Sequence, residues 1–127
     1  MAQYIIEGGN KLEGVVNASG SKNASLPIIA ASILSEKTTT LYNVPNIQDI
    51  KITLEILRIL GCNVVRKNGK IIINSNGINK TEIPRDLMHK LRSSVILAGA
   101  IIGRFRKAVF SYPGDCDIWW RQRTRLR

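Results

Sequence analysis

Two stretches of the chain repeat apolar residues at helical spacing over a long range. Range 46–61, NIQDIKITLEILRILG, has the clearest period, and Gly61 follows it as a stop signal. Range 85–105, RDLMHKLRSSVILAGAIIGRF, predicts a second long helix. The residues expected on the two buried faces are Ile50, Leu54, Leu57 and Leu60 in the first helix, and Leu87, Leu91, Val95, Ala98 and Ile102 in the second.

A third helix is predicted within 19–35, SGSKNASLPIIAASILS, where apolar residues follow a run of small polar ones. Ser19 or Ser21 is expected to cap it. Pro27 falls in its first turns, where it removes a backbone donor and frees the carbonyl of Asn23. Its buried face is expected to hold Leu26, Ile29, Ala30 and Ile33.

The remaining apolar residues alternate or cluster as they do in short strands. A hairpin is predicted at 62–74, because Asn68-Gly69 separates two β-branched runs. Other strands are expected at 3–9, 11–18, 38–45 and the start of 107–117. Helices that alternate with strands and hairpins predict an α/β or α+β fold.

Composition narrows the class of protein. The chain has 127 residues, of which 44% are hydrophobic, enough for one domain with a core. The start has no secretory signal pattern and no apolar run approaches a membrane span, so a cytoplasmic protein is expected. The formal net charge is +10, which suggests an anionic partner, but four arginines of the last nine residues contribute much of it.

The motif Ser-Gly-Ser-Lys-Asn at 19–23 has two interpretations. It could be a plain helix cap. Alternatively, Lys22 and nearby backbone amides could bind a phosphate or carboxylate, with Asn23 adding directed hydrogen bonds. It is no Walker loop, because the required glycine spacing is absent.

The two cysteines differ in their surroundings. Cys62 follows a helix stop and is expected to be a small core residue, whereas Cys116 lies in the turn-rich sequence YPGDCDI. Carboxylates at Asp115 and Asp117 disfavour a thiolate there, which favours a proton-donating thiol over a nucleophile. Arg92 is either a solvated arginine or a ligand for an anion, and the chain has no metal-ligand cluster.

Five segments in this order resemble the N-terminal part of bacterial UDP-N-acetylglucosamine enolpyruvyl transferases. They are GSKNASLPIIAASIL, LYNVPNIQDI, LEILRILG, KLRSSVILAGAIIGRF and FSYPGDCDI, and the resemblance runs from about residue 3 to residue 118. The family usually has glycine where this chain has Asp115, and the sequence after Ile118 departs from the family pattern. That abrupt change predicts a frameshift or a shortened reading frame.

The resemblance implies a reaction and roles for four residues. Lys22 and Asn23 would bind phosphoenolpyruvate, Arg92 would hold UDP-N-acetylglucosamine, and Cys116 would donate a proton to the methylene carbon of phosphoenolpyruvate and be the target of fosfomycin. The enolpyruvyl group would pass to the 3′-hydroxyl of the sugar with release of phosphate, the first committed step of peptidoglycan synthesis. No metal and no organic cofactor are implied.

The resemblance also implies two domains, each an inside-out α/β barrel built from βαβαββ units. Residues 1–20 would form strands of the second domain, 21–118 part of the first domain with the cysteine loop, and 119–127 a basic tail foreign to the family. Strands and helix faces without their partners predict self-association through unpaired edges.

Two alternatives remain open at this point. The charge and the Trp-Arg tail are compatible with a small nucleic-acid-binding protein, although no such motif is present. A fragment similar to 5-enolpyruvylshikimate-3-phosphate synthase would share the Gly-Ser-Lys start, but that enzyme lacks the following Asn-Ala and the Pro-Gly-x-Cys loop.

Overall fold

A computed structural model describes residues 3–90 and 94–109. Its sheet has three strands, β1 (Thr38–Tyr42), β2 (Asn63–Lys67) and β3 (Lys70–Asn74), in the order β1-β3-β2. Both outer strands pair antiparallel with β3. The predicted hairpin is confirmed, since Asn68 and Gly69 both adopt the positive φ that a tight two-residue turn requires.

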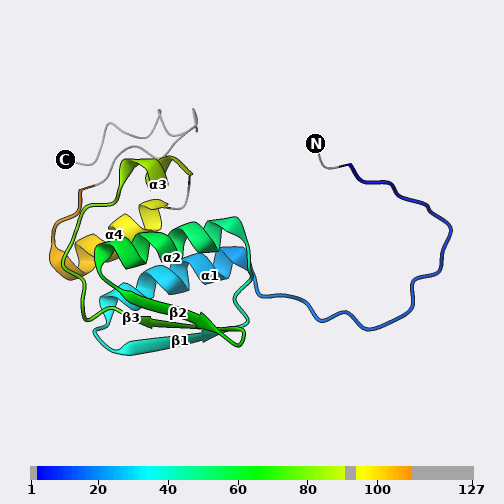
Figure 1. Ribbon diagram of the computed structural model, residues 1–127, viewed down its shortest axis with the longest axis horizontal. Coiled ribbons are helices and arrows are strands. Elements are labelled where there is room, and N and C mark those ends of the chain that lie inside the picture. The colour runs from blue at the N-terminus through cyan, green and yellow to red at the C-terminus, as the bar shows by residue number, and fades with distance from the viewer. Residues whose placement is uncertain (1–2, 91–93, 110–127) are drawn as a thin grey trace.

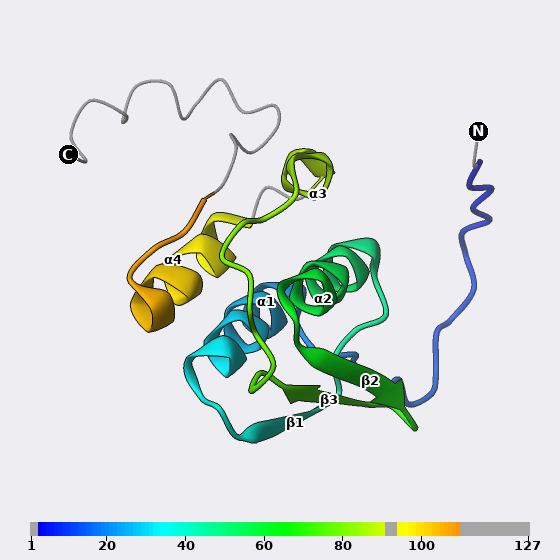
Figure 2. The ribbon, with the colours of Figure 1, turned by 60° about the vertical axis from the view of Figure 1, so that its left-hand side comes forward.

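Four helices accompany the sheet: α1 (Lys22–Ala31), which continues into the 3₁₀ turn η1 (Ser32–Leu34), α2 (Gln48–Leu60), α3 (Arg85–Lys90) and α4 (Ser94–Phe105). Figures 1 and 2 show α1 and α2 side by side on one face of the sheet, with α4 against α1 on the side away from it. The element order from α1 to β3 is that of the predicted βαβαββ unit without its first strand.

The core lies between the helices and the sheet. The faces predicted for α1 and α2 are buried, and alternate strand residues point toward them. Gly61 ends α2 with a φ of 111°, and a Cβ there would lie 2.4 Å from the carbonyl oxygen of Gly77, so this stop is glycine for two reasons. The strand residues that complete the core are Leu41, Val64, Ile71 and Ile73.

Two strands expected near the N-terminus do not form. Residues 3–20 contain no strand, and residues 3–19 are exposed. The residues of such a segment allow it to form a strand. The strand is stable, however, only when a neighbouring strand pairs with it. At the other end, Val109 forms only an isolated parallel bridge with Glu82, and the remainder of the strand predicted from residue 107 lies outside the described residues.

The second long helix is also corrected. Figures 1 and 2 show α3 offset from α4, so range 85–105 is not one straight helix. The predicted face is confirmed only in part: Leu87 and Ala98 are buried, but Val95 and Ile102 are 39% and 46% exposed. Leu97 and Ile101 are buried instead. The apolar residues of α4 lie on almost every side of the helix, so their spacing does not identify the buried face.

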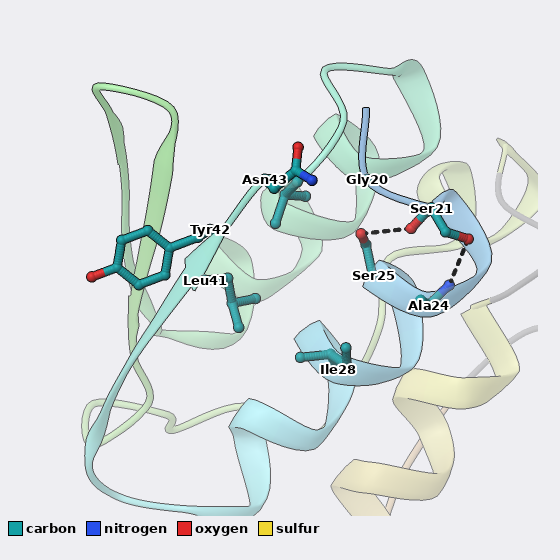
Figure 3. A pocket seen from close by; sticks show the side chains of 9 residues that line it. Gly20, Ser21, Ala24, Ser25, Ile28, Leu41, Tyr42 and Asn43 are labelled. Carbon is teal, nitrogen blue, oxygen red and sulfur yellow. Dashed lines mark hydrogen bonds between the residues drawn. The ribbon is translucent and has the colours of Figure 1, made fainter. Parts of the chain in front are cut away.

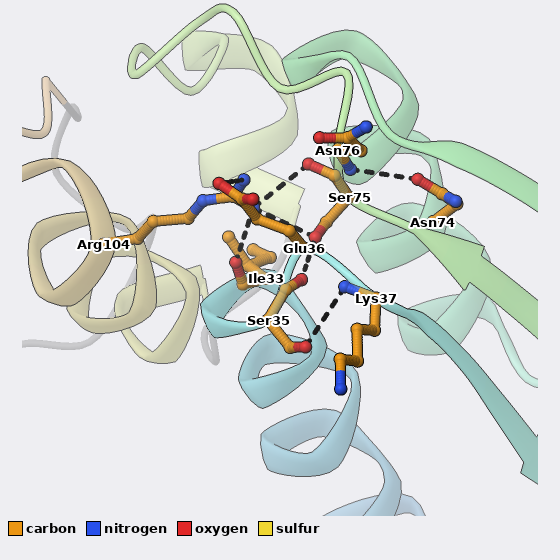
Figure 4. Close-up of polar contacts among 8 residues, drawn as sticks. All are labelled: Ile33, Ser35, Glu36, Lys37, Asn74, Ser75, Asn76 and Arg104. Atoms are coloured by element: carbon orange, nitrogen blue, oxygen red, sulfur yellow. Dashed lines mark hydrogen bonds and ion pairs between the residues drawn. The ribbon is translucent and has the colours of Figure 1, made fainter.

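Arg104, near the end of α4, joins three parts of the fold (Figure 4). Its guanidinium donates to the carbonyl of Ile33 at 2.8 Å and to both the carbonyl and the hydroxyl oxygen of Ser75 at 3.0 Å. The Ser75 hydroxyl in turn donates to the carbonyl of Ser35. The side chain is only 13% exposed and also reaches the carboxylate of Glu36.

Arg104→Met should destabilise the fold by about 2–3 kcal/mol, because it leaves buried oxygen atoms of Ile33 and Ser75 without a donor. Chemical denaturation followed by circular dichroism measures this difference. Lys107→Met, at an exposed position, should change stability by less than about 0.5 kcal/mol. Equal effects of the two substitutions would contradict the structural role of Arg104.

Candidate functional site

The start of α1 carries the small polar motif found in the sequence. Ser21 is the N-cap, and its side chain accepts a hydrogen bond from the backbone N–H of Ala24 at 3.4 Å. Ser25 donates its hydroxyl to the carbonyl of Ser21 at 2.7 Å. The cap interpretation is therefore confirmed for Ser21 rather than Ser19, and it leaves the side chains of Lys22 and Asn23 on the surface.

Gly20 fixes where this helix begins. It lies against Asn43, just after β1, so closely that a Cβ would stand 1.8 Å from the Asn43 carbonyl oxygen. Asn43 itself adopts a φ of 54°, a left-handed conformation that asparagine tolerates better than most residues. The end of β1 and the start of α1 are thereby held together.

Lys22 does not stand free on the surface. Its ammonium nitrogen lies 2.8 Å from a carboxylate oxygen of Asp49, in the first turn of α2. This pair brings the N-termini of α1 and α2 to the same end of the fold. Both side chains remain partly exposed, at 48% and 36%, so a ligand can reach the ammonium.

The helix starts that flank this pair favour negative charge. The carboxylate of Asp49 meets the partial positive charge at the start of α2, while Lys22 stands at the start of α1, where a cation is disfavoured unless an anion neutralises it. The ion pair satisfies both conditions. Pro27, inside α1, has no N–H to give to the carbonyl of Asn23, as the sequence predicted.

A pocket of about 240 Å³ lies beside this end, between α1 and β1 (Figure 3). Neither Lys22 nor Asn23 lines it. Apolar groups make up most of its wall, with the polar Ser21, Ser25 and Asn43 at one side. The lining residues are Gly20, Ser21, Ala24, Ser25, Ile28, Leu41, Tyr42, Asn43 and Val44.

Arg66 also stabilises this end of the fold. From β2 it donates through Nη2 to the carbonyl of Val44 at 2.9 Å, which secures the loop between β1 and α2. Its Nη1 is buried and has no partner among the described residues. Asp49 and Arg66 were both missed in the sequence, because their partners are 27 and 22 residues away and no local motif marks them.

Cys62 is a buried free thiol, as expected. Burial raises its pKa from 9.0 to about 11, and the positive charge of Arg104 opposes part of that rise. A thiol held in this way stays protonated at neutral pH and is a poor nucleophile. The core role predicted for Cys62 fits this environment.

The structure describes only part of the predicted site. Lys22 and Asn23 lie together on α1, whereas Arg92 and Cys116 fall outside the described residues. Within residues 3–90 and 94–109, no group of three or more histidine, cysteine, aspartate or glutamate side chains is placed to hold a metal ion. None of the helices in that part of the chain is long and apolar enough to cross a membrane.

Comparison with known proteins gives a consistent result. Residues 6–123 match the family described as EPSP synthase (3-phosphoshikimate 1-carboxyvinyltransferase). The chain is 44% identical over 118 residues to the UDP-N-acetylglucosamine 1-carboxyvinyltransferase of Desulfatibacillum aliphaticivorans, covering 93% of this chain and 28% of that protein. It is 41% identical over 121 residues to UDP-N-acetylglucosamine 1-carboxyvinyltransferase 2 of Caldanaerobacter subterraneus subsp. tengcongensis, covering 95% of this chain and 29% of that one.

A solved structure shares the fold as well. The enolpyruvyl transferase NikO from Streptomyces tendae superposes with a TM-score of 0.69 and 26% identity, over 77% of this chain and 23% of that one. The enolpyruvyl transferase type of α/β fold predicted from the sequence is thus confirmed. The chain spans less than a third of the length of these relatives.

The buried thiol leads to a direct test. At pH 8, iodoacetamide should leave Cys62 unmodified in the folded chain, because the thiol is both inaccessible and protonated. Mass spectrometry of peptides reports the modification, and the same treatment in guanidinium chloride should modify Cys62 fully. Rapid alkylation of Cys62 under native conditions would contradict this assignment.

Proposed function

We propose that this chain, which belongs to the EPSP synthase family, supplies one wall of the active site of a UDP-N-acetylglucosamine 1-carboxyvinyltransferase. The names of its sequence relatives favour UDP-N-acetylglucosamine over shikimate 3-phosphate as the acceptor. The reaction would transfer the enolpyruvyl group of phosphoenolpyruvate to the 3′-hydroxyl of the sugar and release phosphate. Its product would enter peptidoglycan synthesis.

The observation that carries this proposal is the ion pair between Lys22 and Asp49 at the converging helix starts. An ammonium beside two helix N-termini is a suitable place for a dianionic phosphate. Asp49 holds the ammonium of Lys22 at a fixed position before a ligand arrives, so less freedom is lost on binding. Asn23, one residue further along α1, would add a directed hydrogen bond to phosphoenolpyruvate.

Two further roles rest on the family pattern. Arg92 would hold UDP-N-acetylglucosamine, and Cys116 would protonate the methylene carbon as the sugar oxygen adds to the adjacent carbon. A general acid must keep its proton until the transition state, which agrees with carboxylates on both sides of Cys116. Expulsion of phosphate then restores the double bond of the enolpyruvyl group.

The partners of this site would be two small anionic molecules in the cytoplasm. The nucleic-acid alternative receives no support from the comparisons, which match carboxyvinyltransferases along most of the chain. The reaction needs a cleft that holds both substrates and excludes water. Because the chain spans less than a third of its relatives, the remaining walls of that cleft would come from elsewhere.

A chimera tests the proposed role of Lys22. Residues 3–118 of this chain replace the matching segment of the Desulfatibacillum enzyme, and phosphate release from the two substrates is measured. The chimera should be active, and Lys22→Ala should lower kcat/KM by about 100-fold or more, because a charge contact to the reacting phosphate is lost. Asp49→Asn should cause a smaller loss, because it leaves Lys22 present but less well positioned.

Lys37→Ala serves as the matched control, since Lys37 is exposed and follows the far end of α1. Its activity should equal that of the parent chimera. An active chimera in which Lys22→Ala retains full kcat/KM would refute the assignment of Lys22.

A second prediction concerns residues 1–127 alone. The purified chain should show no phosphate release above the Cys116→Ala background, because a single wall cannot enclose two substrates. Fosfomycin should alkylate Cys116 far more slowly here than in the Desulfatibacillum enzyme, as mass spectrometry can follow. Robust release that depends on Cys116 would mean that this chain completes the site by itself.

A further inference from the structure

The N-terminus of α2 carries Asp49 but has no capping side chain. Its N-cap residue is Ile47, whose side chain makes no hydrogen bond to the first turn. The turn is closed by a backbone hydrogen bond from the N–H of Lys51 to the carbonyl of Ile47 at 3.1 Å. The direction in which α2 begins therefore depends on the connecting loop, residues 43–47, that leads into it.

Arg66 holds the connecting loop at one point. From β2 its Nη2 donates to the carbonyl of Val44 at 2.9 Å, and the side chain of Val44 is itself buried in the core. Pro45 follows directly, and its ring fixes the backbone φ there. Four residues, 45–48, lie between the held carbonyl and Asp49. The hydrogen bond thus restrains the loop close to the place where α2 starts.

The same loop forms the surface against which α1 begins. A Cβ at Gly20 would lie 1.8 Å from the carbonyl oxygen of Asn43 and 3.5 Å from Cδ of Pro45. Figure 3 shows the first turn of α1 next to Asn43. Lys22 follows Gly20 by two residues. A shift of the connecting loop would therefore displace both members of the ion pair that Lys22 forms with Asp49.

Arg58 makes a similar contact at the other end of α2. It lies in the last turn of that helix, and its Nε and Nη2 donate to the carbonyl of Val64 on β2, both at 3.3 Å. Arg58 and Arg66 thus each give hydrogen bonds to one backbone carbonyl. Of these two arginines, the one that donates to the connecting loop is Arg66, so Arg58 provides a matched comparison.

We propose that Arg66 is a positioning residue for the enolpyruvyl transfer. It would act through the carbonyl of Val44 and the connecting loop, and so hold Lys22 and Asp49 where the phosphate of phosphoenolpyruvate binds. This inference rests on the proposed function, which assigns that phosphate to Lys22. Arg66 is no catalytic residue in this scheme, because the charge that meets the substrate belongs to Lys22. A small displacement of such a charge is enough to slow a reaction that depends on exact placement.

Hydrogen exchange, followed at single amides by nuclear magnetic resonance, tests the positioning in residues 1–127 without any substrate. Arg66→Met keeps an unbranched apolar side chain but removes the donor. It should speed exchange of the amides of 51–53 by at least about fivefold, because the first turn of α2 loses its restraint. Arg58→Met should leave these amides unchanged. Unaltered exchange at 51–53 in Arg66→Met, or an equal acceleration at 71–73 in the central strand, would overturn the proposal.

Phosphate release by the chimera then tests the consequence for the reaction. Arg66→Met should lower kcat/KM by about tenfold in the parent chimera but by no more than about twofold in Lys22→Ala, because no ammonium is left to position. Arg66→Lys, which keeps a donor for the carbonyl of Val44, should recover most of the loss. Arg58→Met should match the parent chimera. The same tenfold loss on both backgrounds would show a general structural role and refute the positioning role.

Failure of this inference is distinguishable from failure of the proposed function. An active chimera in which Lys22→Ala has no effect refutes the proposed function, whatever the exchange rates show. A chimera that loses activity in Lys22→Ala but not in Arg66→Met refutes only the role of Arg66.

Discussion

The contact between Gly20 and the carbonyl of Asn43 is the constraint on which the candidate site depends. It joins the start of α1 to the end of β1 at a distance that only glycine permits. The position of α1 then places Lys22 against Asp49 at the start of α2, while Arg66 secures the intervening loop through Val44. A residue without a side chain thus determines where the charged side chains lie.

The local elements of this fold were predictable where the signal was local. The helical period of α2, its glycine stop and the Asn-Gly turn each depend on a few neighbouring residues, and all three are confirmed. The capping role of Ser21 has the same origin. Features that depend on distant partners were not predictable in this way: Asp49 looked like an ordinary acidic residue in a first helical turn, and nothing in the sequence near Arg66 points to Val44.

Two of the predictions that the structure corrects, the N-terminal strands and the buried face of α4, failed for a common physical reason. Residues 3–18 have the composition of strands, but strands are stable only beside other strands, and none lies beside them here. In α4 the apolar residues encircle the helix, so their spacing cannot tell which side meets the core. In both cases the sequence shows which residues are apolar enough to be buried. The neighbouring helices and strands determine which of them are buried.

The core of the described fold is nevertheless closed. Ile29 of α1, Ile33 of η1, and Ile71 and Ile73 of β3 are fully buried. Arg104 satisfies the carbonyl groups where α4 meets η1 and the end of β3. None of these contacts involves the segment 3–19 or the exposed side chains of Lys22 and Asn23. The contacts that stabilise the core therefore lie apart from the two side chains that are proposed to bind phosphoenolpyruvate. The body can hold the Lys22–Asp49 pair in place without the rest of a catalytic cleft, because the interactions that position the pair lie within residues 20–66. Such a body holds the Lys22 ammonium and the Asp49 carboxylate together at its surface through contacts of its own.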